Sequence, residues 1–199
     1  SFKGPFRIQS IDGFGSTLVC AGWRTDGEQL GEKFRSLAMM ESSQFGEPFH
    51  AHEYGHHLVQ EAAAWMAKCA VFENTRALSC VGLLATSGRN IDDACCLWLV
   101  DATGSYRVRA HAVGLGAKIV NDQLRAIDLE SLTCSEACRQ ILEIMVNGSG
   151  NIDETKEDLS EKEVTPWSLP HDARVELAFV KPRQQKMSRI RIDRLLTSL

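Results

Sequence analysis

Apolar residues in this 199-residue chain follow two different periods, and the order of those periods restricts the fold. Some segments alternate apolar and polar residues, as strands do, whereas others repeat apolar residues at helical spacing. The predicted order is two strands, two helices, three strands, two helices, one strand and a terminal helix. Because strands come in clusters and helices in consecutive pairs, the sequence predicts an α+β fold with antiparallel strands.

The bounds of these elements follow from turn and capping signals. The predicted strands are 6–11, 16–21, 77–86, 95–100, 106–110 and 175–180. The predicted helices are 25–46, 50–71, 117–124 and 134–146, and residues 187–199 are predicted to form a short extended piece and then a C-terminal helix at about 190–199. Capping boxes, in which a hydroxyl and a carboxylate cap the first helical turn, are predicted for Thr25 with Glu28 and for Thr133 with Glu136. We expect a single domain, 1–199, with an acidic surface insertion at about 148–170.

Composition excludes several functions. The formal net charge is −4 and the sequence pI is near 5.9, which argues against a nucleic-acid partner. The chain has no run of about 18 apolar residues, so we expect no membrane partner. The seven cysteines are an odd number without a C-x-x-C pair, which indicates buried thiols in a reducing cytosol and no structural zinc framework.

One motif suggests metal chemistry. His52-Glu53-Tyr54-Gly55-His56 matches H-E-x-x-H on a predicted helix. The two histidines would lie one helical turn apart and could bind Zn²⁺ on one face, with Glu53 as the general base. A catalytic zinc needs a third protein ligand, and no second signature follows downstream. A zinc metallopeptidase is therefore an alternative hypothesis.

Several short segments of the sequence resemble those of proteasome core-particle subunits, the α-type more than the β-type. They occur in the family's order along almost the whole chain from Phe6 onward. The most specific segment is 97–106, Leu-Trp-Leu-Val-Asp-Ala-Thr-Gly-Ser-Tyr, which is similar to the family's Leu-Tyr-x-x-Asp-Pro-Ser-Gly-Ser-Tyr hairpin. The segment 74–84 resembles the family's Arg-Pro-x-Gly strand, with Ala77 where Pro is usual. The other similar segments are 20–27, 44–48, 112–124, 132–144 and 175–180.

The resemblance implies an N-terminal-nucleophile hydrolase fold, which is a four-layer αββα sandwich of two antiparallel sheets between helical layers. It implies a non-catalytic subunit in the ring assembly of a threonine-protease complex, with no catalytic, cofactor-binding or metal-ligating residue and no cofactor. The expected partners are other α- and β-type subunits and a regulatory particle or activator. Roles in chamber architecture, gating and activator docking follow as expectations, for ubiquitin-dependent protein degradation in the cytoplasm and nucleus.

The chain departs from the family at its start. The family's first helix and first two strands have no counterpart, so we expect a sandwich that is incomplete at the N-terminus. Ser1 falls in the wrong place for an N-terminal nucleophile. A β-type subunit that lacks its catalytic strands is therefore a second alternative. The acidic insertion, and the lack of an Asp-x-x-Ser-Gly stretch after the fourth helix, favour the α-type.

Overall fold

The computed structural model describes residues 7–12, 15–45, 51–86, 95–129, 131–147, 175–180 and 188–192. The chain divides into two compact units. Unit 1 comprises Ser1–Arg109 and Arg174–Leu199, and unit 2 comprises Ala110–Ala173. The expectation of a single domain stays a prediction, and the expected acidic insertion at 148–170 lies outside the described residues.

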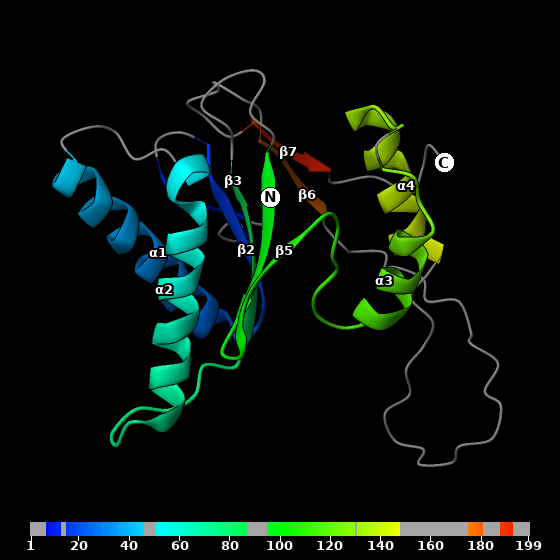
Figure 1. The fold of residues 1–199 in the computed structure, drawn as a ribbon. Coiled ribbons are helices and arrows are strands. Elements are labelled where there is room, and N and C mark those ends of the chain that lie inside the picture. Colours follow the sequence, from blue (N-terminus) through cyan, green and yellow to red (C-terminus); the bar gives the residue numbers. More distant parts are fainter. Residues whose placement is uncertain are drawn as a thin grey trace, which may run out of the picture. The chain divides into compact units, whose positions relative to one another are not determined.

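Unit 1 is built on a five-stranded antiparallel sheet (Figure 1). Its strands, in spatial order, are β1 (Gln9–Ser10), β2 (Thr17–Gly22), β3 (Cys80–Thr86), β4 (Cys96–Asp101) and β5 (Gly104–Val108). Each strand pairs antiparallel with the next, as the clustering of strand-like segments predicts. The β4–β5 turn is closed by Asp101, whose Oδ1 accepts hydrogen bonds from the backbone N–H of Thr103 at 2.7 Å and Gly104 at 3.2 Å. Strand β5 begins at Gly104, two residues before position 106, where the sequence predicts its start.

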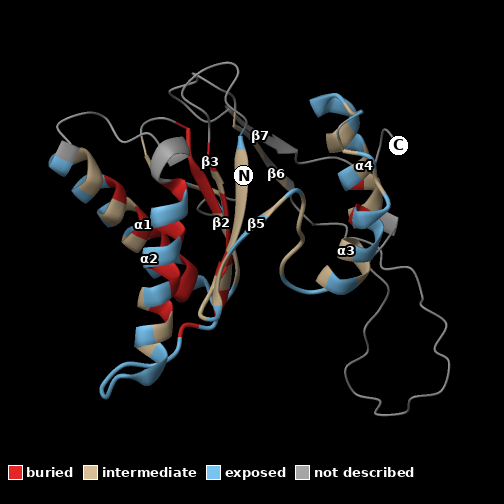
Figure 2. Cartoon of the chain, viewed as in Figure 1, coloured by how far each residue is buried: buried red, intermediate tan, exposed pale blue. Residues whose placement is uncertain are grey.

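Two helices cover one face of this sheet. Helix α1 (Arg24–Phe45) and helix α2 (Ala51–Val71) pack against each other and against strands β2 to β5. The hydrophobic core lies between the helices and the sheet, where Figure 2 shows buried residues in red. Phe34 and Leu30 of α1 and Met66 of α2 are fully buried there, against Leu84 and Val100 of the sheet. Burial of such side chains supplies most of the stability of the unit, at roughly 1.5–3 kcal/mol each.

The opposite face of the sheet is also apolar. Because side chains alternate across a strand, Leu83 points away from the face that holds Leu84. Leu83 lies in one cross-strand row with Val19, Leu99 and Tyr106. A sheet with two apolar faces has to be covered on both sides. We refer to the side of the sheet that contains this row as the second apolar face.

Unit 1 contains a second, smaller sheet. Strand β6 (Val175–Phe179) pairs antiparallel with β7 (Ser188–Ile192). The short extended piece predicted after 187 is observed as the start of β7. The strand continues to Ile192, so the predicted start of the C-terminal helix at 190 is wrong, because the alternation with a period of two extends over this segment and pairs with β6. Residues 193–199 lie outside the described residues. The observed fold is α+β with antiparallel sheets, and the four-layer sandwich stays a prediction.

Unit 2 contains helix α3 (Ala117–Arg125) and helix α4 (Cys134–Asn147), which contact each other. The capping box predicted at the start of α4 is confirmed. The Thr133 backbone N–H donates to Glu136 Oε2 at 2.8 Å, and the Glu136 N–H donates to Thr133 Oγ1 at 3.3 Å. The side-chain hydrogen bond from Thr133 lowers the pKa of Glu136. In neither unit is a described helix long and apolar enough to cross a membrane.

The capping box makes a measurable contribution to α4. Replacing Thr133 with Ala leaves the Glu136 N–H without its side-chain acceptor, and we expect the free energy of unfolding to fall by about 1 kcal/mol. The control is Ser135→Ala, an exposed substitution in the same helical turn, which should change the value by less than about 0.5 kcal/mol. Urea unfolding followed by circular dichroism measures both. Equal effects of the two substitutions would contradict the capping role.

Candidate functional site

A buried carboxylate lies where α1 begins. Asp26 is 0% exposed, and its side chain accepts three hydrogen bonds from the segment that leads into β3. Arg76 Nη1 donates to Asp26 Oδ2 at 2.7 Å, and Arg76 Nη2 donates to Oδ1. The Ser79 backbone N–H donates to Oδ2 at 2.7 Å. Both oxygens of Asp26 are therefore engaged, so this carboxylate joins two parts of the fold instead of acting as an acid or base.

The electrostatics of Asp26 agree with that role. The hydrogen bonds from Arg76 and then from Ser79 favour the ionised form and hold the pKa of Asp26 at about 2, despite its burial. The hydrogen bonds between the two side chains also raise the pKa of Arg76. The ion pair therefore stays intact at neutral pH and weakens only in acid.

The backbone beside this ion pair is also held by a hydrogen bond and a close approach. The Trp23 N–H donates to Ser79 O at 2.8 Å, which fixes the chain between β2 and α1. Gly22, the last residue of β2, has φ of 108°, a conformation that a residue with a Cβ rarely adopts. A Cβ at Gly22 would also lie 2.8 Å from Cys80 Cα and would clash with the Ser79 carbonyl oxygen. We refer to Gly22, Trp23, Asp26, Arg76 and Ser79 together as the α1 junction.

The capping box predicted at Thr25 is wrong. Helix α1 begins at Arg24, and its first helical hydrogen bond runs from Gly27 N–H to Trp23 O at 3.0 Å. Thr25 therefore lies inside the first turn, where it cannot cap. Glu28 bonds instead to Arg24 Nε at 2.9 Å. The tie from Trp23 to Ser79 sets the start of the helix earlier than the local sequence indicates.

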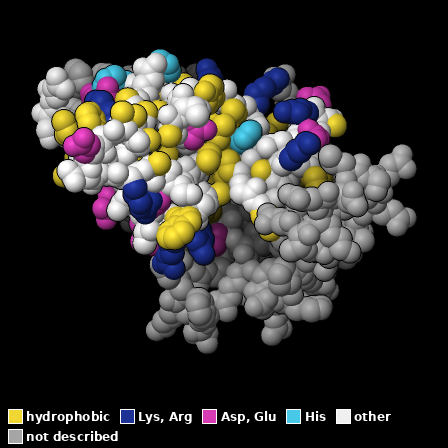
Figure 3. Space-filling view, turned by 90° about the horizontal axis from the view of Figure 1, so that it is seen from below, with side chains coloured by type: hydrophobic (Ala, Val, Ile, Leu, Met, Phe, Trp, Pro, Cys, Tyr) yellow, Lys and Arg dark blue, Asp and Glu magenta, His cyan; other side chains and the backbone are white. Residues whose placement is uncertain are grey.

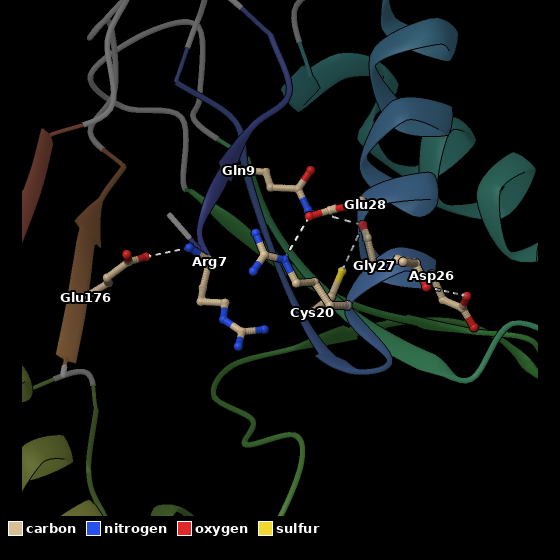
Figure 4. Close-up of polar contacts among 9 residues, drawn as sticks. Arg7, Gln9, Cys20, Asp26, Gly27, Glu28 and Glu176 are labelled. Atoms are coloured by element: carbon tan, nitrogen blue, oxygen red, sulfur yellow. Dashed lines mark hydrogen bonds and ion pairs between the residues drawn. The ribbon is translucent and has the colours of Figure 1, made fainter. Parts of the chain in front are cut away.

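A second polar cluster fastens β1 to α1 (Figure 4). The Gln9 side-chain Nε2 donates to Gly27 O at 3.1 Å, and Gln9 Oε1 accepts from Arg35 Nη1 at 3.3 Å. The absence of a side chain at Gly31 leaves room for the Gln9 amide. Cys20 also lies against Gly27, with its Sγ 3.8 Å from Gly27 O. Burial, followed by the neighbouring Cys80, raises the pKa of the Cys20 thiol to about 12, so this sulfur is not a nucleophile at neutral pH.

The H-E-x-x-H motif falls on helix α2, as predicted. The side chains of His52 and Glu53 lie outside the described residues. His56 is exposed and has its ring 5.7 Å from that of Trp98, at a tilt of 53°. The next residue, His57, is paired through Nδ1 with Glu41 of α1 at 3.1 Å. Within the part of the chain that the structure describes, no group of three His, Cys, Asp or Glu side chains could hold a metal ion.

Large apolar side chains are exposed along α1 and just after α2. Trp23, at its start, is 68% exposed, and Phe72, which follows α2, is 62% exposed. Met39 and Met40, in the second half of α1, are also exposed. Figure 3 shows hydrophobic side chains in yellow on the surface of the described residues, among basic and acidic ones.

The described architecture is compatible with a proteasome-type fold, an α+β protein with an antiparallel sheet and a pair of helices packed on it. No model of a known protein family matches the chain. The chain is similar to proteasome subunit alpha type-3 of Oryza sativa subsp. japonica, with 27% identity over 160 residues. The match covers 80% of this chain and 60% of the relative, so the chain spans well under two thirds of the relative's length.

Proposed function

We propose that this chain is a non-catalytic, α-type proteasome-like subunit that acts by assembling with other subunits into a ring. The observation that carries the proposal is the similarity to a proteasome α-type subunit over 80% of the chain. The α+β architecture is compatible with it.

The proposal includes partners and a setting. The partners are other α- and β-type subunits, with an activator or regulatory particle docking on the ring. The chain would contribute to chamber architecture and to gating of protein degradation in the cytoplasm and nucleus.

Co-assembly tests the proposal. The full chain, tagged and co-expressed with a set of α- and β-type proteasome subunits, should be recovered in ring-sized complexes by affinity capture and native mass spectrometry. Cross-linking should identify α-type neighbours on both sides, whereas a β-type role would give β-type neighbours. The tag alone is the control. Recovery of a well-folded monomer that co-purifies with no subunit would contradict the proposal.

The zinc hypothesis makes a contrasting prediction. If the chain is a structural subunit, purified protein should contain far less than one zinc per chain by atomic emission, and His52→Ala should not change that content. His57→Ala is the matched control, because His57 is next to the motif and already pairs with Glu41. One zinc per chain that is lost in His52→Ala and His56→Ala but kept in His57→Ala would favour the metallopeptidase.

A further inference from the structure

Two cysteines lie one helical turn apart on α4. Cys134 is the first residue of the helix, and Cys138 follows four positions later. The capping box of Thr133 and Glu136 fixes the first turn, so both cysteines lie in regular helix. Residues four positions apart share one face of a helix, with Cβ atoms about 5–6 Å apart. Burial, followed by the neighbouring Cys134, raises the pKa of the Cys138 thiol, which agrees with two sulfur atoms that lie close together.

The two thiols of α4 reach the surface, whereas the sequence predicts buried thiols. Cys134 is exposed, Cys138 is half-buried, and both are free of disulfide bonds. Among the described residues neither sulfur has a hydrogen-bond partner. Cys20 and Cys95, in contrast, each lie against a backbone carbonyl oxygen. The two sulfur atoms on α4 are therefore open to a ligand that enters from solvent.

The spacing of the pair suits a bridging atom better than a direct sulfur–sulfur bond. A disulfide needs Cβ atoms about 3.5–4.5 Å apart, which is shorter than the spacing of one helical turn. Closing a disulfide would therefore distort the first turn of α4, which the bond between Thr133 and Glu136 holds. Two thiolate–metal bonds of about 2.3 Å each place the sulfur atoms up to about 4.6 Å apart, a span that a pair separated by one turn can provide.

The available ligands favour a soft cation that needs only two of them. Within the described residues no third His, Cys, Asp or Glu side chain joins the pair in a metal-binding group. Glu136, which lies between the two cysteines in the sequence, already accepts hydrogen bonds from the Thr133 N–H and hydroxyl. A structural zinc site needs four ligands and is therefore disfavoured. Thiolates select soft ions such as monovalent copper, which is stable between two sulfur ligands.

We propose that Cys134 and Cys138 form a two-thiolate binding site for a soft monovalent cation, of which monovalent copper is the example that fits. Binding releases one proton from each thiol to solvent and changes no oxidation state. The second thiolate binds within the same molecule, so the pair should hold the ion about a hundredfold more tightly than one cysteine does. The site lies on α4 alone and is independent of the proposed assembly function.

Protection of the thiols from alkylation tests the site. The full chain, reduced and kept free of oxygen, is mixed with an equimolar amount of monovalent copper and then treated with iodoacetamide, and mass spectrometry follows the alkylation of each cysteine. Cys134 and Cys138 should be protected together, whereas the exposed Cys95 should react as it does without copper. In Cys138→Ser the protection of Cys134 should fall by about tenfold or more, because a single thiolate binds the ion weakly.

A variant with the wrong spacing is the matched control. Cys138→Ser combined with Gln140→Cys keeps two thiols on α4 but turns the second about 120° away around the helix axis, so it should not restore protection. Cys138→Ser combined with Ala137→Cys returns a thiol to the same face and should restore it. Protection of Cys134 that is unchanged in Cys138→Ser, or that Gln140→Cys restores, would overturn the proposal. Equal protection of Cys95 would also overturn it, because the ion would then bind single thiols.

Discussion

Replacing Asp26 with Ala should lower the free energy of unfolding by about 2–4 kcal/mol, measured by urea unfolding at pH 7. The substitution removes a fully buried carboxylate that accepts from Arg76 and from the Ser79 backbone. The Ser79 N–H would be left without its acceptor, and of the contacts between the segment entering β3 and the start of α1, the backbone hydrogen bond from Trp23 to Ser79 O would remain. Asp26→Asn should cost less, because the amide keeps the shape of the side chain and one oxygen acceptor.

The same residue makes the stability depend on pH in a defined window. The folded pKa of Asp26 is about 2, below the 3.8 that is ordinary for an aspartate side chain, so its contribution is present above pH 4. The contribution should be lost as the pH falls from about 4 towards 2, where the folded carboxyl takes up its proton. The Asp26→Asn variant should lack this part of the acid dependence. Identical acid profiles for the two proteins would contradict the assignment.

Gly22→Ala should be among the most damaging single substitutions in unit 1, with an expected loss of more than about 3 kcal/mol. Two costs combine at this position. Ala at a φ of 108° is strained, and its Cβ would meet the backbone of Ser79 and Cys80, which cannot rotate away. The expected result is a large fall in the midpoint of thermal unfolding, or an insoluble product.

Gly31→Ala is the matched control for Gly22→Ala. A Cβ at Gly31 would also be crowded, but its neighbour is the flexible end of the Gln9 side chain, which can move. The Gly31 backbone is helical, where Ala is preferred to Gly, so the net loss should be no more than about 1 kcal/mol. Equal losses at the two positions would show that crowding alone, and not backbone conformation, determines the cost.

Local periodicity was enough to predict nearly every described element, because each has a clear apolar stripe or alternation. It ended the extended piece after 187 too early, because residues 190–192 were assigned to the helix that the following leucines indicate, whereas they continue β7. The strand there depends on pairing with β6, a partner that no local pattern identifies. The α4 capping box was predictable because both of its residues lie within one helical turn. The capping box at Thr25 was not, because a bond from Trp23 to Ser79 determines where α1 begins.

The α1 junction and the contact of Glu176 with the Arg7 backbone could not be predicted from the sequence. Asp26 and Arg76 each belong to a segment that resembles a known family, but nothing local pairs them across 50 positions. The contact of Glu176 with Arg7 uses backbone N–H groups, which any residue carries and which leave no signal in side-chain chemistry. The H-E-x-x-H spacing, in contrast, is visible in sequence, and the structure adds only that His56 and His57 have other neighbours.

The pair of Asp26 and Arg76 closes a loop that contains most of α1 and all of α2. Bringing the ends of this loop together carries an entropic cost, and the pairing of β2 with β3, in which Gly22 lies opposite Cys80, shares that cost with the ion pair. The same loop is therefore closed twice, once by a strand pair and once by a buried carboxylate. Loss of Asp26 removes one closure and leaves the other in place.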